Sequence, residues 1–136
     1  MSEVVIAAIG RTPIGRAVKG SLIDQRPDDL GAYVVDQVLK QIPQLDRGQI
    51  DDVICGCALP GGEQGHNLGR IISILAGVNA RGTTVNRFCS SSLLAVRMAF
   101  HAIKADEGSA FVCAGVESSP RSPGSCRPAS APWSPR

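Results

Sequence analysis

Cys89 stands at the point where a β-branched segment gives way to an apolar helical segment, in the stretch VNRFCSSSLL at residues 85–94. A thiol at the start of a helix meets the positive end of the helix dipole and several unpaired backbone N–H groups, which favour the thiolate. The same N–H groups can hold a developing oxyanion. Cysteine is also among the residues most often buried as a small hydrophobe. The residues alone therefore leave two interpretations open for Cys89, a nucleophile or a structural thiol.

A cysteine nucleophile needs a base, and the chain offers few. His101 is twelve residues further along the same helix, about 18 Å at 1.5 Å per residue, so it cannot reach the thiol. His66 lies in a glycine-rich loop and could come near the thiol, but the sequence does not define its position. Cys113 falls within a predicted strand and Cys126 in an unusual C-terminal stretch, and neither is a credible second acid or base.

The patterns around the other cysteines and around Glu117 indicate structural roles. Cys55 and Cys57 form the pair CGC, but no further ligands at a suitable spacing accompany them, so we expect small strand residues rather than a metal site. Glu117 follows a predicted strand, and we interpret it as a structural hydrogen-bond acceptor rather than a general base. The five cysteines are an odd number without regular spacing, which favours reduced thiols and a cytoplasmic location.

Composition and charge exclude several classes of function. Three of the 14 basic residues lie after residue 119, so residues 1–119 carry 11 basic against 12 acidic side chains. No clustered basic face is predicted, and we expect no nucleic-acid partner. The N-terminal apolar run spans only residues 4–9 after an acidic residue. It fits neither a secretory signal nor a membrane span, so we expect no membrane association.

Two periodicities alternate along the chain. Short apolar or β-branched runs, bounded by turn residues, predict buried strands at 4–9, 52–59, 83–88 and 110–116. Apolar positions with helical spacing predict helices at 28–42, 67–76 and 93–105. This order is typical of an α/β layered fold with a mixed, mostly parallel sheet.

The third helix has a narrow polar stripe formed by Arg97, His101 and Lys104. Apolar residues occupy the rest of its circumference, which predicts a buried helix that carries Cys89 at its start. Four strands and two helices can hardly cover it, so we expect that a further layer is missing and that residues 1–119 form an incomplete half-domain.

The composition changes after Ser119. Residues 120–136 hold five of the nine prolines and no acid, which predicts a disordered Pro/Ser/Arg-rich tail. A sharper hypothesis is that this tail is out-of-frame coding sequence, because a GC-rich gene read in a wrong frame yields this mixture.

The segment VNRFCSSSL resembles the Asn-Arg-x-Cys-Ser-Ser motif of the thiolase family, whose cysteine carries the acyl group. Three further segments resemble that family's motifs in the same order: RTPIGRAVKGSL at 11–22, GGEQGHNLGR at 61–70 and AGVESS at 114–119. The resemblance covers residues 4–119 and indicates the amino-terminal part of an acetyl-CoA acyltransferase or acetyltransferase. Ser92 and Ala114 stand where many thiolases have glycine, which bears on specificity more than on chemistry.

The resemblance implies a mechanism. Cys89 would attack the carbonyl of a 3-ketoacyl-CoA, acetyl-CoA would leave, and a second coenzyme A thiol would take the acyl group, in fatty-acid β-oxidation or acetoacetyl-CoA metabolism. Coenzyme A is thus a substrate, and no separate cofactor is expected. The family's histidine base in Gly-His-Pro, its second cysteine in Cys-x-Gly and its Asn-Glu segment belong to a carboxy-terminal half, and the resemblance gives none of these three motifs a counterpart in these 136 residues.

Three hypotheses follow. The chain is a truncated thiolase that is inactive alone, although Cys89 still reacts stoichiometrically. Alternatively, it is a non-catalytic fragment that pairs with itself as a homo-oligomer or with a full-length thiolase subunit, since uncovered apolar patches tend to find partners. The third is that half a core leaves the chain without a stable fold.

Overall fold

A computed structural model describes residues 3–17 and 19–119 of the chain. The predicted tail at 120–136 lies outside the described residues. The elements are α1 (Pro27–Leu39), the short 3-10 helix η1 (Arg47–Gln49), β1 (Asp52–Gly56), the 3-10 helix η2 (Gly62–Gln64), α2 (Leu68–Leu75), β2 (Arg81–Val85), α3 (Ser91–Lys104) and β3 (Phe111–Gly115). The expected alternation of strands and helices in an α/β fold is confirmed.

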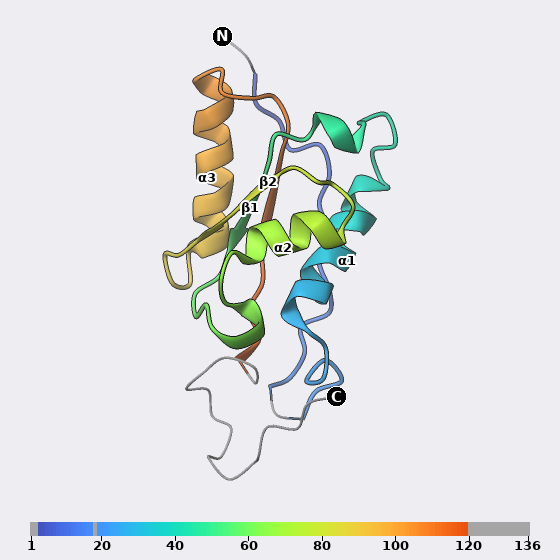
Figure 1. Cartoon of the computed structure of the whole chain (residues 1–136), viewed down its shortest axis with the longest axis vertical. Helices are drawn as coiled ribbons and strands as arrows, with labels where there is room; N and C mark the ends of the chain where they lie inside the picture. The colour runs from blue at the N-terminus through green and yellow to red at the C-terminus, as the bar shows by residue number, and fades with distance from the viewer. Residues whose placement is uncertain (1–2, 18, 120–136) are drawn as a thin grey trace.

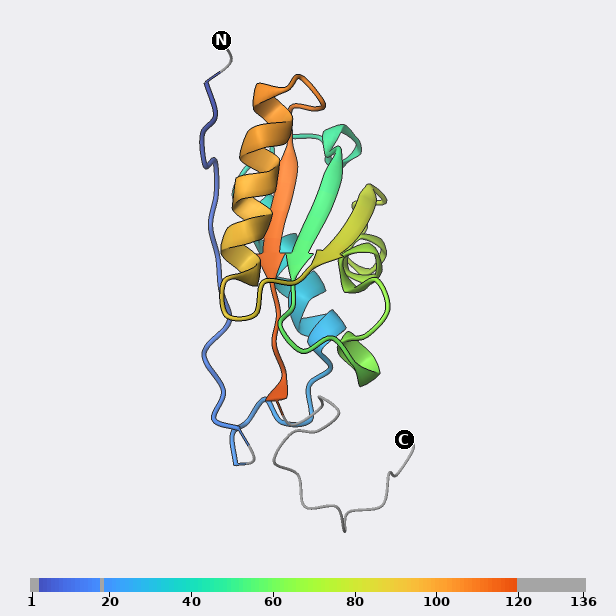
Figure 2. The same ribbon diagram turned by 90° about the vertical axis from the view of Figure 1, so that its left-hand side faces the viewer.

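The three strands form one sheet in the order β2-β1-β3, and both pairings are parallel. Helices α1 and α2 cover one face of this sheet and α3 covers the other, as Figures 1 and 2 show. The mixed sheet that the sequence suggests is therefore purely parallel within the described residues. A parallel sheet needs cover on both faces, and the helices supply it.

The main core lies between the sheet and the α1/α2 layer. Val53 and Cys55 of β1 are fully buried there against Leu68 and Ile72 of α2. A smaller cluster on the other face joins Ile54 of β1 to the alanines of α3. Because successive strand residues point to opposite faces, β1 contributes to both cores.

Helix α1 begins at Pro27, which suits the first helical position, and places Asp28 and Asp29 in its first turn. It ends at Leu39, three residues before the predicted end at 42. Its buried residues are Pro27, Asp28, Gly31, Ala32, Val35 and Leu39. A stripe of Leu30, Val34 and Val38 at helical spacing is half-buried. The half-buried stripe packs on the N-terminal segment instead, where a Cβ on Gly10 would lie 2.7 Å from Val38.

The strand predicted at residues 4–9 is wrong. This segment runs extended along one side of the molecule (Figure 2), but it pairs with no strand within the described residues. Val5, Ile6 and Ile9 are 70–77% exposed. A run with strand propensity forms a strand only when another strand lies within hydrogen-bonding distance, and none does here.

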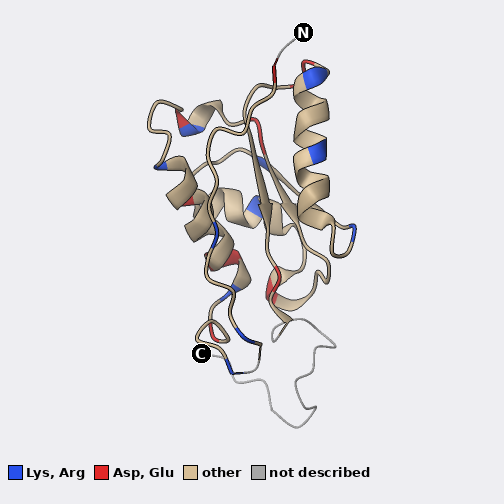
Figure 3. Cartoon of the chain, turned by 180° about the vertical axis from the view of Figure 1, so that it is seen from behind, with Lys and Arg blue, Asp and Glu red and all other residues tan. Residues whose placement is uncertain are grey.

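Helix α3 is buried on one side only, which corrects the expectation of a buried helix. Ser91, Ala95 and Ala99 face the sheet, whereas Leu93 is 68% exposed and Phe100 is 43% exposed. Figure 3 shows this helix with basic residues as its only charged positions and with uncharged residues between them. Within the described residues, no helix is long and apolar enough to cross a membrane.

Candidate active site

Cys89 lies in the turn between β2 and α3, two residues before the first residue of the helix, and its side chain is exposed. It lines a hollow of about 380 Å³ at the carboxyl ends of β1 and β3. Ala58, Ser92 and Glu117 line the same hollow. The thiol is thus accessible rather than enclosed by hydrocarbon, which favours the nucleophile over the structural thiol.

Local hydrogen bonds hold the turn that carries Cys89. The side-chain oxygen of Asn86 accepts a bond from the Phe88 backbone N–H at 2.8 Å. The buried hydroxyl of Ser91 accepts from the Arg87 N–H at 2.9 Å and donates to the Phe88 carbonyl at 2.6 Å. Phe88 adopts a φ of +48°, a conformation that is costly for a bulky residue. We call residues 86–91 the nucleophile turn.

The first turn of α3, which follows Cys89 in the sequence, contains free hydrogen-bond donors. Among the described residues, none accepts a hydrogen bond from the backbone N–H of Ser92 or Leu93. The helix is 14 residues long, so its positive end adds to the attraction for an anion. Such an environment suits both a thiolate and an oxyanion formed next to it.

Two glycines allow this helix end to approach the sheet. Gly56 and Gly115 are cross-strand partners at the ends of β1 and β3. A Cβ on Gly56 would lie 2.4 Å from the Ser92 backbone nitrogen, and a Cβ on Gly115 would lie 2.7 Å from the Ser92 side chain. Both positions therefore require glycine so that the helix can pack with its N-terminus against the strand ends.

The other described cysteines differ from Cys89. Cys55 is fully buried, and burial raises its pKa to about 12. Burial likewise raises the pKa of Cys113 to about 11. The pKa of Cys57 is raised by burial first and by the Glu117 carboxylate second. In the described part of the chain, no group of His, Cys, Asp and Glu side chains is arranged to hold a metal ion.

The two histidines do not join the hollow. His66 is exposed in the loop between η2 and α2 and is not among the residues that line it. His101 lies in the last turn of α3, where its ring meets Phe100 edge-on with centroids 5.5 Å apart. The described residues therefore place no histidine beside Cys89.

Glu117 and Gln64 form a clamp next to the hollow. The Glu117 carboxylate accepts hydrogen bonds from the Ala58 N–H at 2.7 Å and from the Gln64 amide at 2.9 Å. Gln64 is fully buried, and it also donates to the Leu59 carbonyl and accepts from the Ser118 N–H. Glu117 is a hydrogen-bond acceptor near a strand end, as predicted. Gln64 is not predicted from the sequence, where its only signal is its place in the glycine-rich segment.

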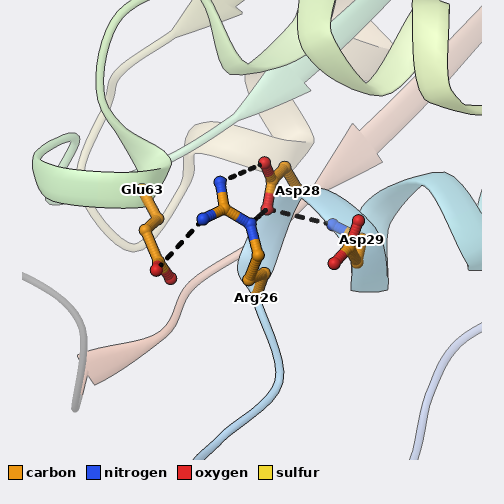
Figure 4. A network of polar contacts seen from close by, with 4 residues as sticks. All are labelled: Arg26, Asp28, Asp29 and Glu63. Atoms are coloured by element: carbon orange, nitrogen blue, oxygen red, sulfur yellow. Dashed lines mark hydrogen bonds and ion pairs between the residues drawn. The ribbon is translucent and has the colours of Figure 1, made fainter. Parts of the chain in front are cut away.

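An ion-pair network fixes the η2 segment that carries Gln64. Arg26 binds the Asp28 carboxylate through two nitrogens, at 2.7 and 3.0 Å, and reaches Glu63 at 3.2 Å (Figure 4). Asp28 also accepts a bond from the Asp29 N–H. The start of α1 is thereby joined to the residue next to Gln64.

Comparison with known proteins identifies the family of this chain. Residues 4–131 match the sequence profile of the family described as "Thiolase, N-terminal domain". The chain belongs to the thiolase family. This result confirms the resemblance drawn from the four motifs.

Three curated thiolases illustrate the similarity. The chain is 45% identical over 125 residues to the beta-ketoadipyl-CoA thiolase of Acinetobacter baylyi, and the aligned residues make up 90% of this chain and 31% of that thiolase. It is 45% identical over 120 residues to the 3-ketoacyl-CoA thiolase of Bacillus subtilis, covering 87% and 30%. It is also 45% identical over 125 residues to the 3-oxoadipyl-CoA/3-oxo-5,6-dehydrosuberyl-CoA thiolase of Escherichia coli, covering 90% and 31%. The chain thus spans less than a third of the length of these thiolases.

Proposed function

We propose that this chain carries the acyl-accepting half of a thiolase site and that Cys89 is its nucleophile. In the cleavage direction, the Cys89 thiolate attacks the 3-keto carbon of a 3-ketoacyl-CoA. The bond between carbons 2 and 3 breaks, carbon 2 takes a proton, and acetyl-CoA leaves the acyl group as a thioester on Cys89. The thiol of a second coenzyme A gives its proton to a base and attacks the thioester carbonyl, which releases a shortened acyl-CoA and the enzyme thiolate. A covalent intermediate divides one difficult step into two easier ones.

The observation that supports this proposal most directly is the exposure of Cys89 in a hollow beside the free N–H groups of α3. Donors at the start of a helix favour a thiolate and can stabilise the tetrahedral oxyanion formed on acyl transfer. The hollow has room for an acyl group and a thioester, at about 380 Å³.

We further propose that the 136-residue chain alone accepts an acyl group but does not turn over. The cleavage step needs a base for the thiol and an acid for carbon 2, and the described residues place no histidine and no second cysteine in the hollow. Each positioned acid or base contributes about 10²- to 10⁴-fold to the rate. The missing groups would be supplied by thiolase sequence outside these residues.

Mass spectrometry of the intact chain tests this proposal. Acetyl-CoA is the probe, because its exchange with a thiolate forms acetyl-Cys89 and free coenzyme A without breaking a carbon–carbon bond. We expect one acetyl group per chain, mapped to the Cys89 peptide, and none in Cys89→Ala. Acetylation of Cys89→Ala at the wild-type rate would refute the role of Cys89 as the nucleophile. Repeated turnover of acetoacetyl-CoA with coenzyme A would refute the claim that the chain is inactive alone.

The substrate class is part of the same proposal. The names of the three relatives each contain a 3-ketoacyl-CoA and differ in the acyl group. We therefore propose 3-ketoacyl-CoA and coenzyme A as substrates, in fatty-acid β-oxidation or acetoacetyl-CoA metabolism, in the reducing cytoplasm. A series of acyl-CoA donors of increasing length, compared by their acylation rates at Cys89, tests the chain-length preference.

A second candidate function is association with another thiolase chain, either a copy of this one or a full-length subunit. Exposed apolar side chains on α3, Leu93 and Val96 among them, support it, because such surfaces tend to find partners. Analytical ultracentrifugation of the chain should show a concentration-dependent larger species, which Leu93→Lys should weaken. A monomer at all concentrations, alone and mixed with a full-length thiolase, would contradict this role.

A further inference from the structure

Hydrogen bonds connect Glu117 to the nucleophile turn through Ala58. The Ala58 N–H donates to the Glu117 carboxylate at 2.7 Å. The carbonyl of the same residue accepts from the Asn86 side chain at 2.9 Å. Asn86 in turn accepts from the Phe88 N–H at 2.8 Å, and Phe88 precedes Cys89.

The far end of this connection is anchored in the core. Gln64 donates to Glu117 at 2.9 Å and is itself fully buried with three hydrogen bonds. Buried polar groups whose hydrogen bonds are all satisfied give a rigid, specific arrangement. Glu117 is therefore anchored to the core through Gln64, and its other oxygen binds the Ala58 N–H.

The contacts of Glu117 argue against proton transfer by this side chain. One carboxylate oxygen accepts from Ala58 and the other from Gln64. A general base has to lie within hydrogen-bonding distance of the proton it removes. Glu117 borders the hollow, but its two oxygens are directed at the Ala58 N–H and the Gln64 amide. Each oxygen keeps a second acceptor site, so the orientation of the carboxylate, and not a lack of lone pairs, favours the structural role.

From these contacts we propose that Glu117 is a positioning residue, which sets the place of Cys89 through Ala58 and Asn86 and exchanges no proton with the substrate. The inference rests on the proposed function of Cys89 as acyl acceptor. A misplacement of about 1 Å can cost on the order of 100-fold in rate. Glu117→Gln keeps the shape but turns a donor toward either Ala58 or Gln64, and we expect about a tenfold slower acylation of Cys89.

A double-variant comparison tests the connection. Asn86→Ala removes the other end of the hydrogen-bonded connection and should also slow the acylation of Cys89 by acetyl-CoA about tenfold. If both residues act through the backbone of Ala58, the double variant Glu117→Gln/Asn86→Ala should be acylated about tenfold more slowly than wild type, and not a hundredfold. The reason is that the first substitution already breaks the connection, so the second has no further effect. Glu107→Gln, which makes the same charge change beyond the far end of α3, is the matched control and should leave the rate unchanged.

Three outcomes would overturn the inference. These are an unchanged rate in Glu117→Gln, effects that multiply in the double variant, and a loss of 100-fold or more with a changed shape of the pH–rate curve. The last is the signature of a lost acid or base. Circular dichroism checks that each variant is folded. If Glu117→Gln does not fold, Glu117→Asp, which keeps the charge but shortens the reach, replaces it in the same comparison.

Alkylation of Cys89 by iodoacetamide separates this inference from the proposed function. If acetyl-CoA never acylates the wild-type chain, the proposed function fails, but alkylation still reports the position of the thiol. The interaction of a thiolate with a helix N-terminus changes reactivity by about threefold, so each single variant and the double variant should be alkylated about threefold more slowly. Equal alkylation of wild type and Glu117→Gln would refute the positioning role independently of acyl transfer.

Discussion

Gly56 lies so close to Ser92 that a Cβ on the glycine would stand 2.4 Å from the serine's backbone nitrogen. The end of β1 and the first turn of α3 are therefore in direct backbone contact. This contact places the start of the helix that follows Cys89 at the carboxyl ends of the parallel strands. It also makes the position of the nucleophile sensitive to a single methyl group.

Gly56→Ala should displace the start of α3. The added carbon meets backbone atoms that cannot rotate away, and such overpacking costs about 1–3 kcal/mol of unfolding free energy. We expect slower acetylation of Cys89 together with a lower midpoint in urea denaturation. Gly48→Ala is the matched control, because its nearest neighbour would be 3.6 Å away. Equal behaviour of the two variants would contradict the close packing.

Ser91→Ala should loosen the nucleophile turn. The hydroxyl of Ser91 is buried and satisfies the Arg87 N–H and the Phe88 carbonyl. Its removal leaves a donor unpaired, at a cost of about 1–3 kcal/mol in unfolding free energy. The neighbouring Ser90→Ala is the control, since Ser90 makes no side-chain cap hydrogen bond to the helix. A similar loss of stability in both variants would show that the Ser91 hydroxyl is not the cause.

Iodoacetamide near neutral pH should label Cys89 before the other described cysteines. Cys55 and Cys57 are buried, and burial raises their pKa values, so they present little thiolate to the reagent. Peptide mapping in a Cys126→Ser background identifies the labelled site. Adding a denaturing concentration of urea should make all the remaining cysteines reactive. Early labelling of Cys55 in the folded chain would contradict the core described above.

The ion pairs of Asp36 predict an acid-sensitive contribution to stability. Hydrogen bonds from Lys40 first and Arg47 second lower the pKa of Asp36 to about 2, from an ordinary value of 3.8. The folded chain therefore binds this proton less tightly than the unfolded chain. The stabilisation is present above the ordinary value and is lost as the pH falls through about 2.

Denaturation of the wild type and of Asp36→Asn between about pH 5 and pH 2 measures this effect. The difference in unfolding free energy between the two should shrink as the pH falls through that window. Because the ion pairs of Asp36 are near the surface, about 1 M salt should reduce the difference in unfolding free energy near pH 5. A difference that stays constant with pH would mean that the carboxylate charge is not responsible.

Local sequence determined much of this protein. The two periodicities predict three of the strands and all three helices, because they depend on neighbours two to four residues away. The cysteine at the junction of VNRF with SSSLL is predicted on the same basis, since a helix start and its free N–H groups are local features. The four motifs indicate the thiolase family before any contact is known.

Only the tertiary structure decided which distant residues meet. Gln64 and Glu117 are 53 positions apart, and no periodicity links them, so their clamp appears only when the ends of β1 and β3 lie side by side. Residues 4–9 have a strand's composition but form none, because a strand needs a hydrogen-bonding neighbour as well as propensity. Gly56 likewise reads as an ordinary strand glycine until α3 packs against it. Local preferences are set within a few residues of the chain, whereas pairing, burial and the reach of Cys89 depend on segments that folding alone brings together.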